Sequence, residues 1–421
     1  MSRIPIGRKR KIAFVCSGGA TKAGAFHLGV ALALQEQGFT FMGGLAPKEA
    51  NPLELPEGVS FESKPMEIST FVGSSAGSII CSYLAAGYTI DNVFNAFLNR
   101  QSTDPVDNFP KPLPPLTYSK MFRIRPELAR EQLSQWDRVF KIVQDLSQGS
   151  WQSLLQLKWV KATGLFTTAG LEQYLREEVL ESNRFLDYRA DLFIVATQLN
   201  HSRKVVFGKY AYEPPPHDLT CQYDNKASIS EACAASTALP FVYAPYEIRH
   251  SNGELYHYID GEIRDTLSTH VAVDAGCDLV IASHTHQPYH FEKKIGSLMD
   301  HGLPAILVQS LYLVIEQKIN NYIHAKETQR SMILALERHC KEIGLTAEQV
   351  RGILGVVEAE LHHRRDVDTI YIHPDPTDAG MFFGEHFSLS PARMMHIVKS
   401  GFRATVEKLR QYDFADRPPR G

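Results

Sequence analysis

The first 38 residues contain an apolar run followed by an amphipathic stretch. Residues 11–16 (KIAFVC) are almost entirely apolar and lead into Ser-Gly-Gly at 17–19. This pattern predicts a buried strand that ends in a turn. Residues 24–37 place apolar side chains at helical spacing, and Gly38 follows as a typical helix-terminating residue. The chain therefore opens with a strand, a glycine-containing turn and a helix.

The same order returns further along the chain. Residues 67–72 predict a second buried strand, 73–77 a tight turn and 78–86 an apolar helix. Further strands are expected at 191–197, 204–207, 255–259, 278–282 and 369–372. Strands that alternate with helices are typical of a mainly parallel sheet covered on both faces. We therefore predict an α/β fold.

Two segments do not follow this alternation. Residues 101–163 begin rich in proline and continue with helical patterning, so they predict a helical insertion. Residues 304–364 predict two long helices, the second of which begins at a capping box formed by Thr346 and Gln349. A last helix is expected to start at Ser390, because proline follows it.

Composition narrows the class of protein. The 421 residues are 44% hydrophobic and 22% charged, which excludes a disordered or fibrous chain. A net charge of −3 gives no global basic field, so we expect no nucleic-acid partner. No apolar stretch is long enough for a transmembrane helix.

The N-terminus and the cysteines indicate in which cellular compartment the protein is expected. Basic residues precede the apolar run at 11–16, as in a secretory signal, but Ser-Gly-Gly at 17–19 interrupts that run. The six cysteines lie far apart and form no CxxC, so we expect buried free thiols. We therefore predict a cytoplasmic protein without a signal peptide.

The turn at 73–77 reads Gly-Ser-Ser-Ala-Gly, a G-x-S-x-G motif between a predicted strand and a predicted helix. In that context the glycines permit a sharp elbow that exposes the central serine at the helix N-terminus. Ser75 is therefore a candidate nucleophile. Gly-Ser-rich turns are also common without any catalytic role.

A serine nucleophile needs donors for the oxyanion and a base. The turn at 17–24 also lies between a strand and a helix, so its N–H groups can supply the donors. It does not fit a P-loop, because Ala25 and Phe26 stand where Lys and Ser/Thr are required. For the base, Asp260 and Gly261 directly follow a predicted strand, although this pattern alone favours an ordinary turn.

Together these elements resemble the patatin-like phospholipase family, the lipid acyl hydrolases of plant tubers and bacteria. The family has a Gly-rich oxyanion loop, a G-x-S-x-G elbow and a later Asp-Gly motif, which match 17–24, 73–77 and 260–261. A fourth block, Ala-Ser-Thr-Ala-Leu-Pro at 235–240, is similar to the family's stretch upstream of the catalytic aspartate.

The resemblance implies a three-layer α/β sandwich and a Ser-Asp dyad without histidine. Ser75 would be the nucleophile and Asp260 the base, and Gly18 and Gly19 would form the oxyanion hole. The positions that support these motifs are Lys22, Gly24, Gly73, Gly77 and Gly261. The sequence departs from the family pattern at two places: Ala20 replaces a loop glycine, with one extra residue in the loop, and Glu262 follows the Asp-Gly motif.

The resemblance also implies one patatin-like domain over residues 1–421. Its core would span 11–290, and 291–421 would be a helical extension packed on it. The implied function is hydrolysis of acyl esters of lipids through an acyl-enzyme, with no cofactor. The alternatives are an acyltransferase or thioesterase with the same dyad, or a lipid-binding protein with weak or no turnover.

Histidines suggest a rival mechanism. A Ser-Asp-His triad could use a histidine after Asp260, for which the candidates are His270, His284, His286 and His386. The spacing of His284 and His286 also allows a zinc site, but no third ligand is in register. We expect neither a triad nor a metal.

The insertion has a distinctive composition. All three tryptophans, Trp136, Trp151 and Trp159, lie in it, and residues 116–163 hold eight basic and four acidic side chains. It either packs on the core or forms a cap that contacts a lipid or acyl-ester substrate at a membrane surface. Peripheral membrane contact is therefore open, and the sequence indicates no oligomeric state.

Overall fold

The computed structural model describes most of the chain outside one long insertion and several shorter segments. The described residues are 3–47, 64–98, 112–125, 164, 166–210, 220–240, 242–250, 253–293, 295–361, 363–383 and 388–415. The tryptophan-containing part of the insertion and His386 lie outside them. The predictions made for those residues therefore remain predictions.

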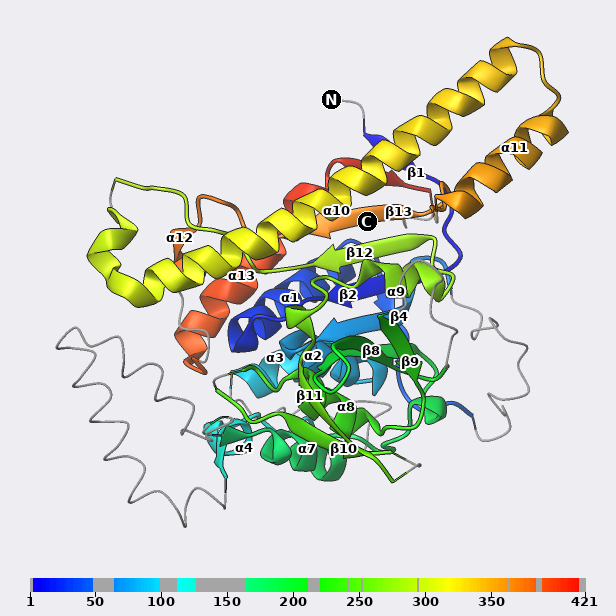
Figure 1. The fold of residues 1–421 in the computed structure, drawn as a ribbon. Coiled ribbons are helices and arrows are strands. Elements are labelled where there is room, and N and C mark those ends of the chain that lie inside the picture. The colour runs from blue at the N-terminus through cyan, green and yellow to red at the C-terminus, as the bar shows by residue number, and fades with distance from the viewer. Residues whose placement is uncertain are drawn as a thin grey trace.

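A mixed sheet forms the centre of the molecule (Figure 1). Its five central strands are parallel and lie in the order β7, β4, β2, β12 and β13. These strands are β7 (Asp191–Gln198), β4 (Glu67–Ser74), β2 (Ile12–Cys16), β12 (Leu279–Ser283) and β13 (Asp368–Ile372). Because they are parallel, the turns after β2 and β4 emerge at the same edge of the sheet.

Beyond β7 the sheet continues with antiparallel pairs. β11 (Leu255–Asp260) pairs antiparallel with β7 and with β10 (Tyr246–Arg249). Asp260 is paired with Ala196 of β7, and Ser74 at the end of β4 is paired with the neighbouring Val195. The last residue of β11 therefore lies across β7 from the end of β4.

Short strands complete the sheets. β8 (Arg203–Phe207) pairs with β7 and with β9 (Cys221–Asp224), and β3 (Thr40–Phe41) pairs with β4. Two small sheets join β1 (Ile4–Ile6) to β14 (Tyr412–Phe414) and β5 (Arg123–Ile124) to β6 (Phe166–Thr167). The strands β3, β9 and β10 were not among those expected from the sequence.

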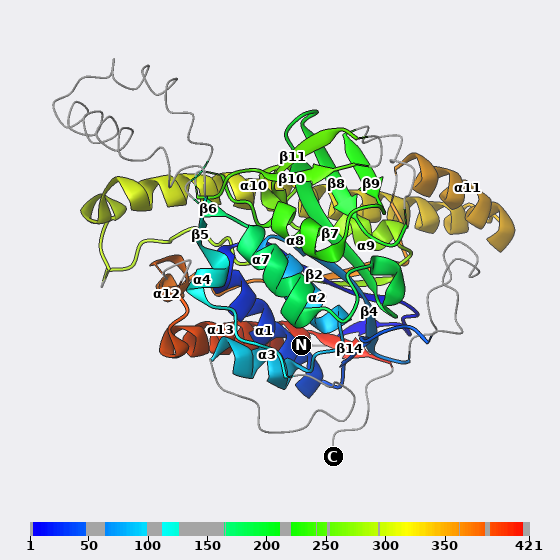
Figure 2. The same cartoon turned by 90° about the horizontal axis from the view of Figure 1, so that it is seen from below.

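Helices cover both faces of the sheet. Alternate residues of β2 belong to different clusters: Phe14 and Cys16 pack with α1, α2, α8 and α13, whereas Ala13 and Val15 pack with α9. Figure 2 shows α1, α2, α3 and α13 gathered on one side. Their bounds are α1 (Ala20–Glu36), α2 (Ala76–Ala85), α3 (Ile90–Phe97), α8 (Ile229–Ser236), α9 (Thr269–Asp274) and α13 (Pro391–Leu409). The predicted three-layer α/β fold is confirmed.

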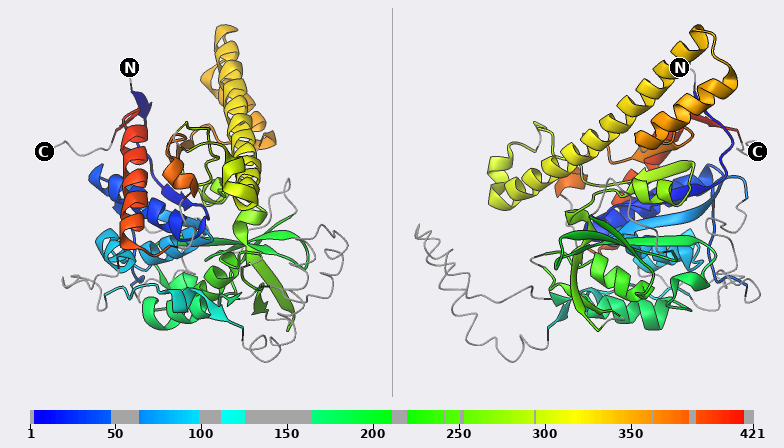
Figure 3. Two further views of the ribbon diagram at one scale, coloured as in Figure 1. Left: turned by 90° about the vertical axis from the view of Figure 1, so that its left-hand side faces the viewer. Right: turned by 45° about the vertical axis from the view of Figure 1, so that its right-hand side comes forward.

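Two long helices extend from this body. α10 (Gly302–Glu342) crosses the molecule and continues beyond it, where α11 (Ala347–Glu360) lies alongside in the opposite direction (Figure 3). The capping box expected at Thr346 and Gln349 is present. Ile333, Cys340, Val350 and Leu354 form a small separate core between the two helices.

The remaining elements are α4 (Tyr118–Met121), α7 (Ala169–Tyr174), η2 (Leu175–Val179), η3 (Phe185–Asp187), η4 (Gly261–Ile263), η5 (Leu298–His301) and α12 (Ala379–Phe383).

Most predicted elements occur within two residues of their expected bounds, with one informative exception. The first helix was expected from residue 24, but α1 begins at Ala20. The turn before it therefore comprises only residues 17–19. All six cysteines are buried free thiols, as expected. Within the described residues, no helix is both long and apolar enough to span a membrane.

Candidate active site

The G-x-S-x-G motif forms a sharp turn between β4 and α2. Ser75 has φ 50° and ψ −125°, a conformation that non-glycine residues rarely adopt. A Cβ at Gly77 would lie 2.2 Å from the Cys16 carbonyl oxygen, and one at Gly73 would lie 2.5 Å from the Ser78 Cα. Only glycine fits at either position. The turn therefore has the geometry of a nucleophile elbow, as the sequence predicted.

The Ser75 hydroxyl lies close enough to the carboxylate of Asp260 to lower the pKa of that group. Asp260 ends β11, on the other side of β7 from the elbow. Both side chains are buried: 7% of Ser75 and 3% of Asp260 is exposed. The structure therefore brings together the two residues that the sequence assigned as nucleophile and base, although they are far apart along the chain.

The backbone of Asp260 is held on both sides. Its N–H donates to the Ala238 carbonyl at 3.0 Å, and its carbonyl accepts from the Thr197 hydroxyl at 3.0 Å. Burial raises the pKa of its carboxyl to about 6, while hydrogen bonds from Ser75 and from the Glu262 N–H lower it. Asp260 is therefore mostly ionised at neutral pH and can accept a proton.

Ser236 is a residue of the site to which the sequence assigned no role. Its hydroxyl accepts from the Ser75 N–H at 2.8 Å and donates to the Val195 carbonyl at 2.6 Å. It therefore fixes the strained peptide of the elbow to β7. The sequence did point to this segment, because Ser236 and Ala238 both belong to the Ala-Ser-Thr-Ala-Leu-Pro block that resembles the family. This block contacts both the nucleophile turn and the backbone of Asp260.

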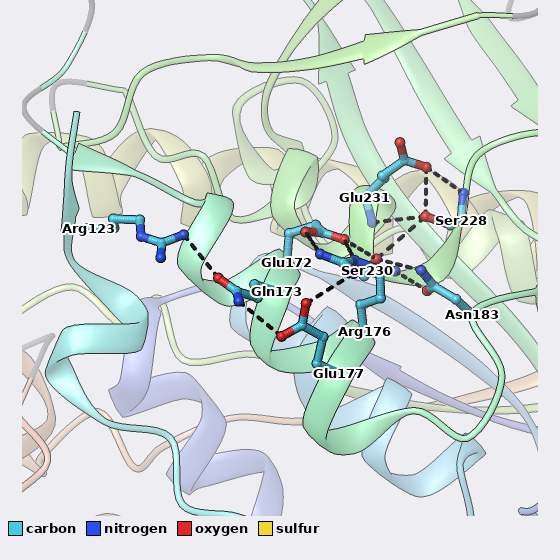
Figure 4. A network of polar contacts seen from close by, with 9 residues as sticks. All are labelled: Arg123, Glu172, Gln173, Arg176, Glu177, Asn183, Ser228, Ser230 and Glu231. Atoms are coloured by element: carbon cyan, nitrogen blue, oxygen red, sulfur yellow. Dashed lines mark hydrogen bonds and ion pairs between the residues drawn. The ribbon is translucent and has the colours of Figure 1, made fainter. Parts of the chain in front are cut away.

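Ser236 is the last residue of α8, and a polar network anchors the start of that helix (Figure 4). Ser228 caps the helix together with Glu231, and their side chains are 2.6 Å apart. Ser230 accepts from Asn183 and donates to Glu172 of α7 at 2.9 Å. Caps of this kind contribute about 1 kcal/mol each. The network thus supports the position of Ser236 from outside the site.

The predicted oxyanion loop is shorter than expected, because Ala20 already belongs to α1. Gly19 has φ 129° and Ala20 has φ 55°, so both residues are in the left-handed region. The first N–H groups of a helix lack partners within it, and Gly19, Ala20 and Thr21 line the same cavity as Ser75. The N-terminal end of α1 therefore faces the nucleophile.

A buried histidine holds the beginning of this loop. His27 Nε2 lies 2.8 Å from the Ser17 carbonyl oxygen, and His27 Nδ1 lies 2.7 Å from the Ser283 hydroxyl. Burial lowers the pKa of His27 to about 4, so the ring is neutral. A carbonyl can only accept, so Nε2 carries the proton. His27 thus connects α1, the loop and the end of β12.

Gly18, a predicted oxyanion donor, already has an acceptor. Its N–H donates to Glu262 Oε1 at 2.8 Å. Glu262 is buried and lines the cavity. Burial and the nearby Asp260 charge together raise the pKa of its carboxyl to about 8. This residue was noted in the sequence only as a departure from the family pattern.

The supporting positions lie around this centre. Gly24 lines the cavity next to the Phe97 ring, and Gly261 begins η4 directly after Asp260. Lys22 is fully buried, and its Nζ donates to the Tyr312 hydroxyl at 2.9 Å and to the Met381 carbonyl at 2.8 Å. Burial lowers the pKa of Lys22 to about 7. Lys22 therefore connects α1 to α10 and α12 rather than pointing at the nucleophile.

The candidate histidines of a triad are dispersed. His270 forms a hydrogen bond with Lys204 and lies next to Asp265. It lines a second cavity, separate from the one that contains Ser75. The buried His284 ring lies 5.3 Å from that of His373. His286 lines the cavity that contains Ser75, and its ring is 5.4 Å from that of Tyr312. In the described residues, no group of three His, Cys, Asp or Glu side chains is arranged to hold a metal ion.

An apolar cavity of about 530 Å³ opens over the dyad. Its wall is formed mainly by aliphatic and aromatic side chains from α2, α3, α7 and α10. Among them are Ile79, Ile80, Tyr83, Phe97, Leu171, Leu239, Tyr243, Tyr312, Val314 and Ile315. Pockets of this size and composition bury apolar ligands. The site therefore pairs a nucleophile with room for a hydrocarbon chain.

Comparison with known proteins is consistent with this geometry. No curated protein matches the chain. A family model for patatin-like phospholipases matches residues 14–273, a span that contains the loop, the elbow, the 235–240 block and Asp260. The chain therefore belongs to the patatin-like phospholipase family.

Proposed function

We propose that this protein is a serine acyl hydrolase that cleaves acyl esters of lipids with Ser75 and Asp260 as its catalytic dyad. The observation that carries the proposal is that the Ser75 hydroxyl lies next to the buried Asp260 carboxylate, and that both residues line one apolar cavity. The family membership supports lipid hydrolysis in general.

The reaction begins when Ser75 Oγ attacks the acyl carbonyl carbon and Asp260 accepts the serine proton. The carbonyl oxygen becomes an oxyanion, and the N–H of Gly19 and the first amide of α1 are placed to stabilise it. Removal of one such donor in a comparable enzyme costs about 3–4 kcal/mol of transition-state stabilisation. Asp260 then returns the proton to the alcohol as the C–O bond breaks.

A water molecule completes the cycle. It loses a proton to Asp260 and attacks the acyl-enzyme, which releases the fatty acid and restores the Ser75 hydroxyl. Each step needs one proton acceptor, so the dyad suffices without a histidine. Because the base must be ionised, activity requires a pH above the pKa of Asp260, which is about 6.

The test is hydrolysis of a phospholipid and of a soluble short-chain ester by the wild type and by Ser75→Ala. The substitution removes only a hydroxyl on a turn, so the protein should fold. We expect at least about a 1,000-fold loss of turnover on both substrates. A control variant, Ser331→Ala, removes an exposed hydroxyl on α10 outside the cavity and should retain full activity.

Product analysis separates the alternatives. Free fatty acid as the main product supports a hydrolase, whereas transfer of the acyl group to an added alcohol supports an acyltransferase. Faster turnover of an acyl-thioester supports a thioesterase. If a fluorophosphonate probe does not label the wild type at Ser75 and no ester is cleaved, the chain is a lipid-binding protein and the proposed activity is wrong.

A further inference from the structure

Glu262 lies outside the Asp-Gly motif of the family, but it contacts both Asp260 and the loop at Gly18. It directly follows Asp260-Gly261, and its backbone N–H donates to Asp260 Oδ1 at 3.0 Å. Its side chain reaches back to the oxyanion loop, where Oε1 accepts from the Gly18 N–H at 2.8 Å. One residue therefore contacts the base through its backbone and the loop through its carboxyl group.

The space around Gly18 shows how tightly these groups are packed. A Cβ at Gly18 would lie 2.6 Å from Glu262 Cγ and 2.8 Å from Ser75 Cβ. The glutamate and the nucleophile thus face each other across one peptide. An acyl carbonyl attacked by Ser75 must place its developing negative charge within this small volume, next to the Glu262 carboxyl.

The surroundings of Glu262 oppose a negative charge on it. The carboxyl is buried, and the charged groups that act on it are Asp260 and Asp265, both acidic. The positive charge nearby, Lys204, is paired with Asp265 instead, and Asp265 also contacts His270. Burial and these carboxylates raise the pKa of Glu262 to about 8, against the hydrogen bond from the Gly18 N–H.

We propose that Glu262 is a positioning residue of the oxyanion loop that acts as a neutral carboxylic acid. The inference rests on the proposed function. The carbonyl oxygen of the neutral acid holds the Gly18 peptide, so that the next amides of the loop face the substrate. Loss of the Glu262 proton places a second negative charge beside the oxyanion and opposes its formation.

This arrangement also keeps the dyad ready for reaction. Two buried carboxyl groups in contact with the same turn do not both ionise readily, and the environment separates their proton affinities. Glu262 retains its proton in the range in which Asp260 has lost its own. Between about pH 6 and pH 8 the site therefore holds one base and one neutral acid.

The test compares the wild type with Glu262→Gln and Glu262→Ala, using kcat/KM for a soluble ester from pH 5 to 9.5. Glutamine keeps an acceptor for Gly18 and cannot ionise, whereas alanine removes the acceptor. Glu247→Gln on β10 is the matched control, because that glutamate is exposed, with 57% of its side chain accessible.

We expect the wild type and the control to lose activity about tenfold per pH unit above pH 8. Glu262→Gln should stay within threefold of the wild type at pH 7 and keep its activity up to pH 9.5. Glu262→Ala should lose at least tenfold at pH 7, because the Gly18 N–H is left without its acceptor.

Two outcomes would overturn the inference. If Glu262→Ala is as active as the wild type or more active, the carboxyl group only blocks the loop. If Glu262→Gln keeps the fall above pH 8, another group titrates, and Lys22 is then the candidate. Both results differ from failure of the proposed function, in which no variant shows turnover that Ser75→Ala abolishes.

A second readout does not depend on activity. Since the folded protein holds the Glu262 proton more tightly than the unfolded chain, the wild type should lose stability relative to Glu262→Gln as pH rises from about 5 to 8. Thermal unfolding of both proteins across this range measures the difference. A constant difference in Tm would mean that Glu262 does not carry the proton, and the inference would be wrong.

Discussion

Two strand-turn-helix units stand side by side in this protein, and the proposed reaction gives them different roles. The unit formed by β4 and α2 presents a side chain, the Ser75 hydroxyl, whereas the unit formed by β2 and α1 presents backbone N–H groups. Each contains a non-glycine residue with positive φ, Ser75 at 50° and Ala20 at 55°. A positive φ therefore occurs at the candidate nucleophile of one unit and at the first helical residue of the other.

The two units also limit each other. Gly77 of the elbow lies against the Cys16 carbonyl at the end of β2, and Gly18 of the loop lies against Ser75. A side chain at either glycine would push the units apart. Ala20 already carries a methyl group, at the cost of backbone strain. The contacts between the units, rather than the turns themselves, determine which glycines are required.

The largest expected effect concerns the base that the elbow needs. Asp260→Asn preserves the shape of the side chain but removes the proton acceptor, so kcat should fall at least about 1,000-fold. Substituting His270, His284, His286 or His386 singly should cost far less. Steady-state kinetics on a soluble ester compares these variants. A histidine variant as inactive as Ser75→Ala would replace the dyad with a triad.

The pH dependence of the wild type checks the same assignment. Since Asp260 acts in its ionised form, kcat/KM should rise about tenfold per pH unit below pH 6 and then stay level up to about pH 8. Rising pH removes the proton that burial favours, so the active form appears as the pH passes the pKa. An acid limb centred near pH 4 instead would mean that the base is more exposed to solvent than Asp260 is.

The next effect tests whether contact between the two units is required. Gly77→Ala would place a methyl group 2.2 Å from the Cys16 carbonyl oxygen, and neither backbone segment can move without the sheet. We expect a loss of about 1–3 kcal/mol in the free energy of unfolding, measured by denaturant titration. The control is Gly352→Ala on the exposed helix α11, where the added methyl group meets no neighbouring atom. Gly44 also has free space around it, but its positive φ would strain an alanine. Equal stability of both variants would contradict this account.

A smaller effect is expected where the elbow is held from behind. Ser236→Ala removes the acceptor of the Ser75 N–H and leaves that buried group unpaired, which typically costs 1–3 kcal/mol. We also expect kcat to fall about tenfold, because without this hydrogen bond the strained turn at Ser75 can relax away from its present geometry. Ser236→Thr keeps the hydroxyl and should restore activity. If Ser236→Ala loses stability but keeps kcat, Ser236 supports only the fold.

The catalytic side of the molecule was more predictable than the rest. Strand-turn-helix patterns located both units, and G-x-S-x-G identified Ser75 because the chemistry needs that spacing. Asp260 was a candidate from its place at a strand end, but an Asp-Gly pair alone favours an ordinary turn, so its assignment as the base depended on the family resemblance. Its approach to Ser75 depends on β11 pairing antiparallel with β7, which no local pattern encodes.

Contacts between distant segments explain what the sequence did not predict. Ser236 acts through a hydrogen bond to a residue 161 positions away, and Glu262 through one to a residue 244 positions away. The start of α1 was placed too late because Ala20 is a good helix former but lies where a glycine was expected. The short edge strands β9 and β10 escaped detection because their apolar patterns are too brief.

The smallest expected effect concerns the strained residue of the loop unit. A non-glycine residue in the left-handed region costs about 1–2 kcal/mol, and Ala20 has φ 55°. Ala20→Gly should relieve this strain, partly offset by the greater freedom of glycine in the unfolded chain, and leave a gain below about 1 kcal/mol. Ala23→Gly is the control, since Ala23 lies inside the same helix and its substitution should destabilise by about 1 kcal/mol. Thermal unfolding of the two variants should therefore shift in opposite directions. If both variants lower the Tm, Ala20 is not strained, and of the two units only the one that contains Ser75 has a strained turn.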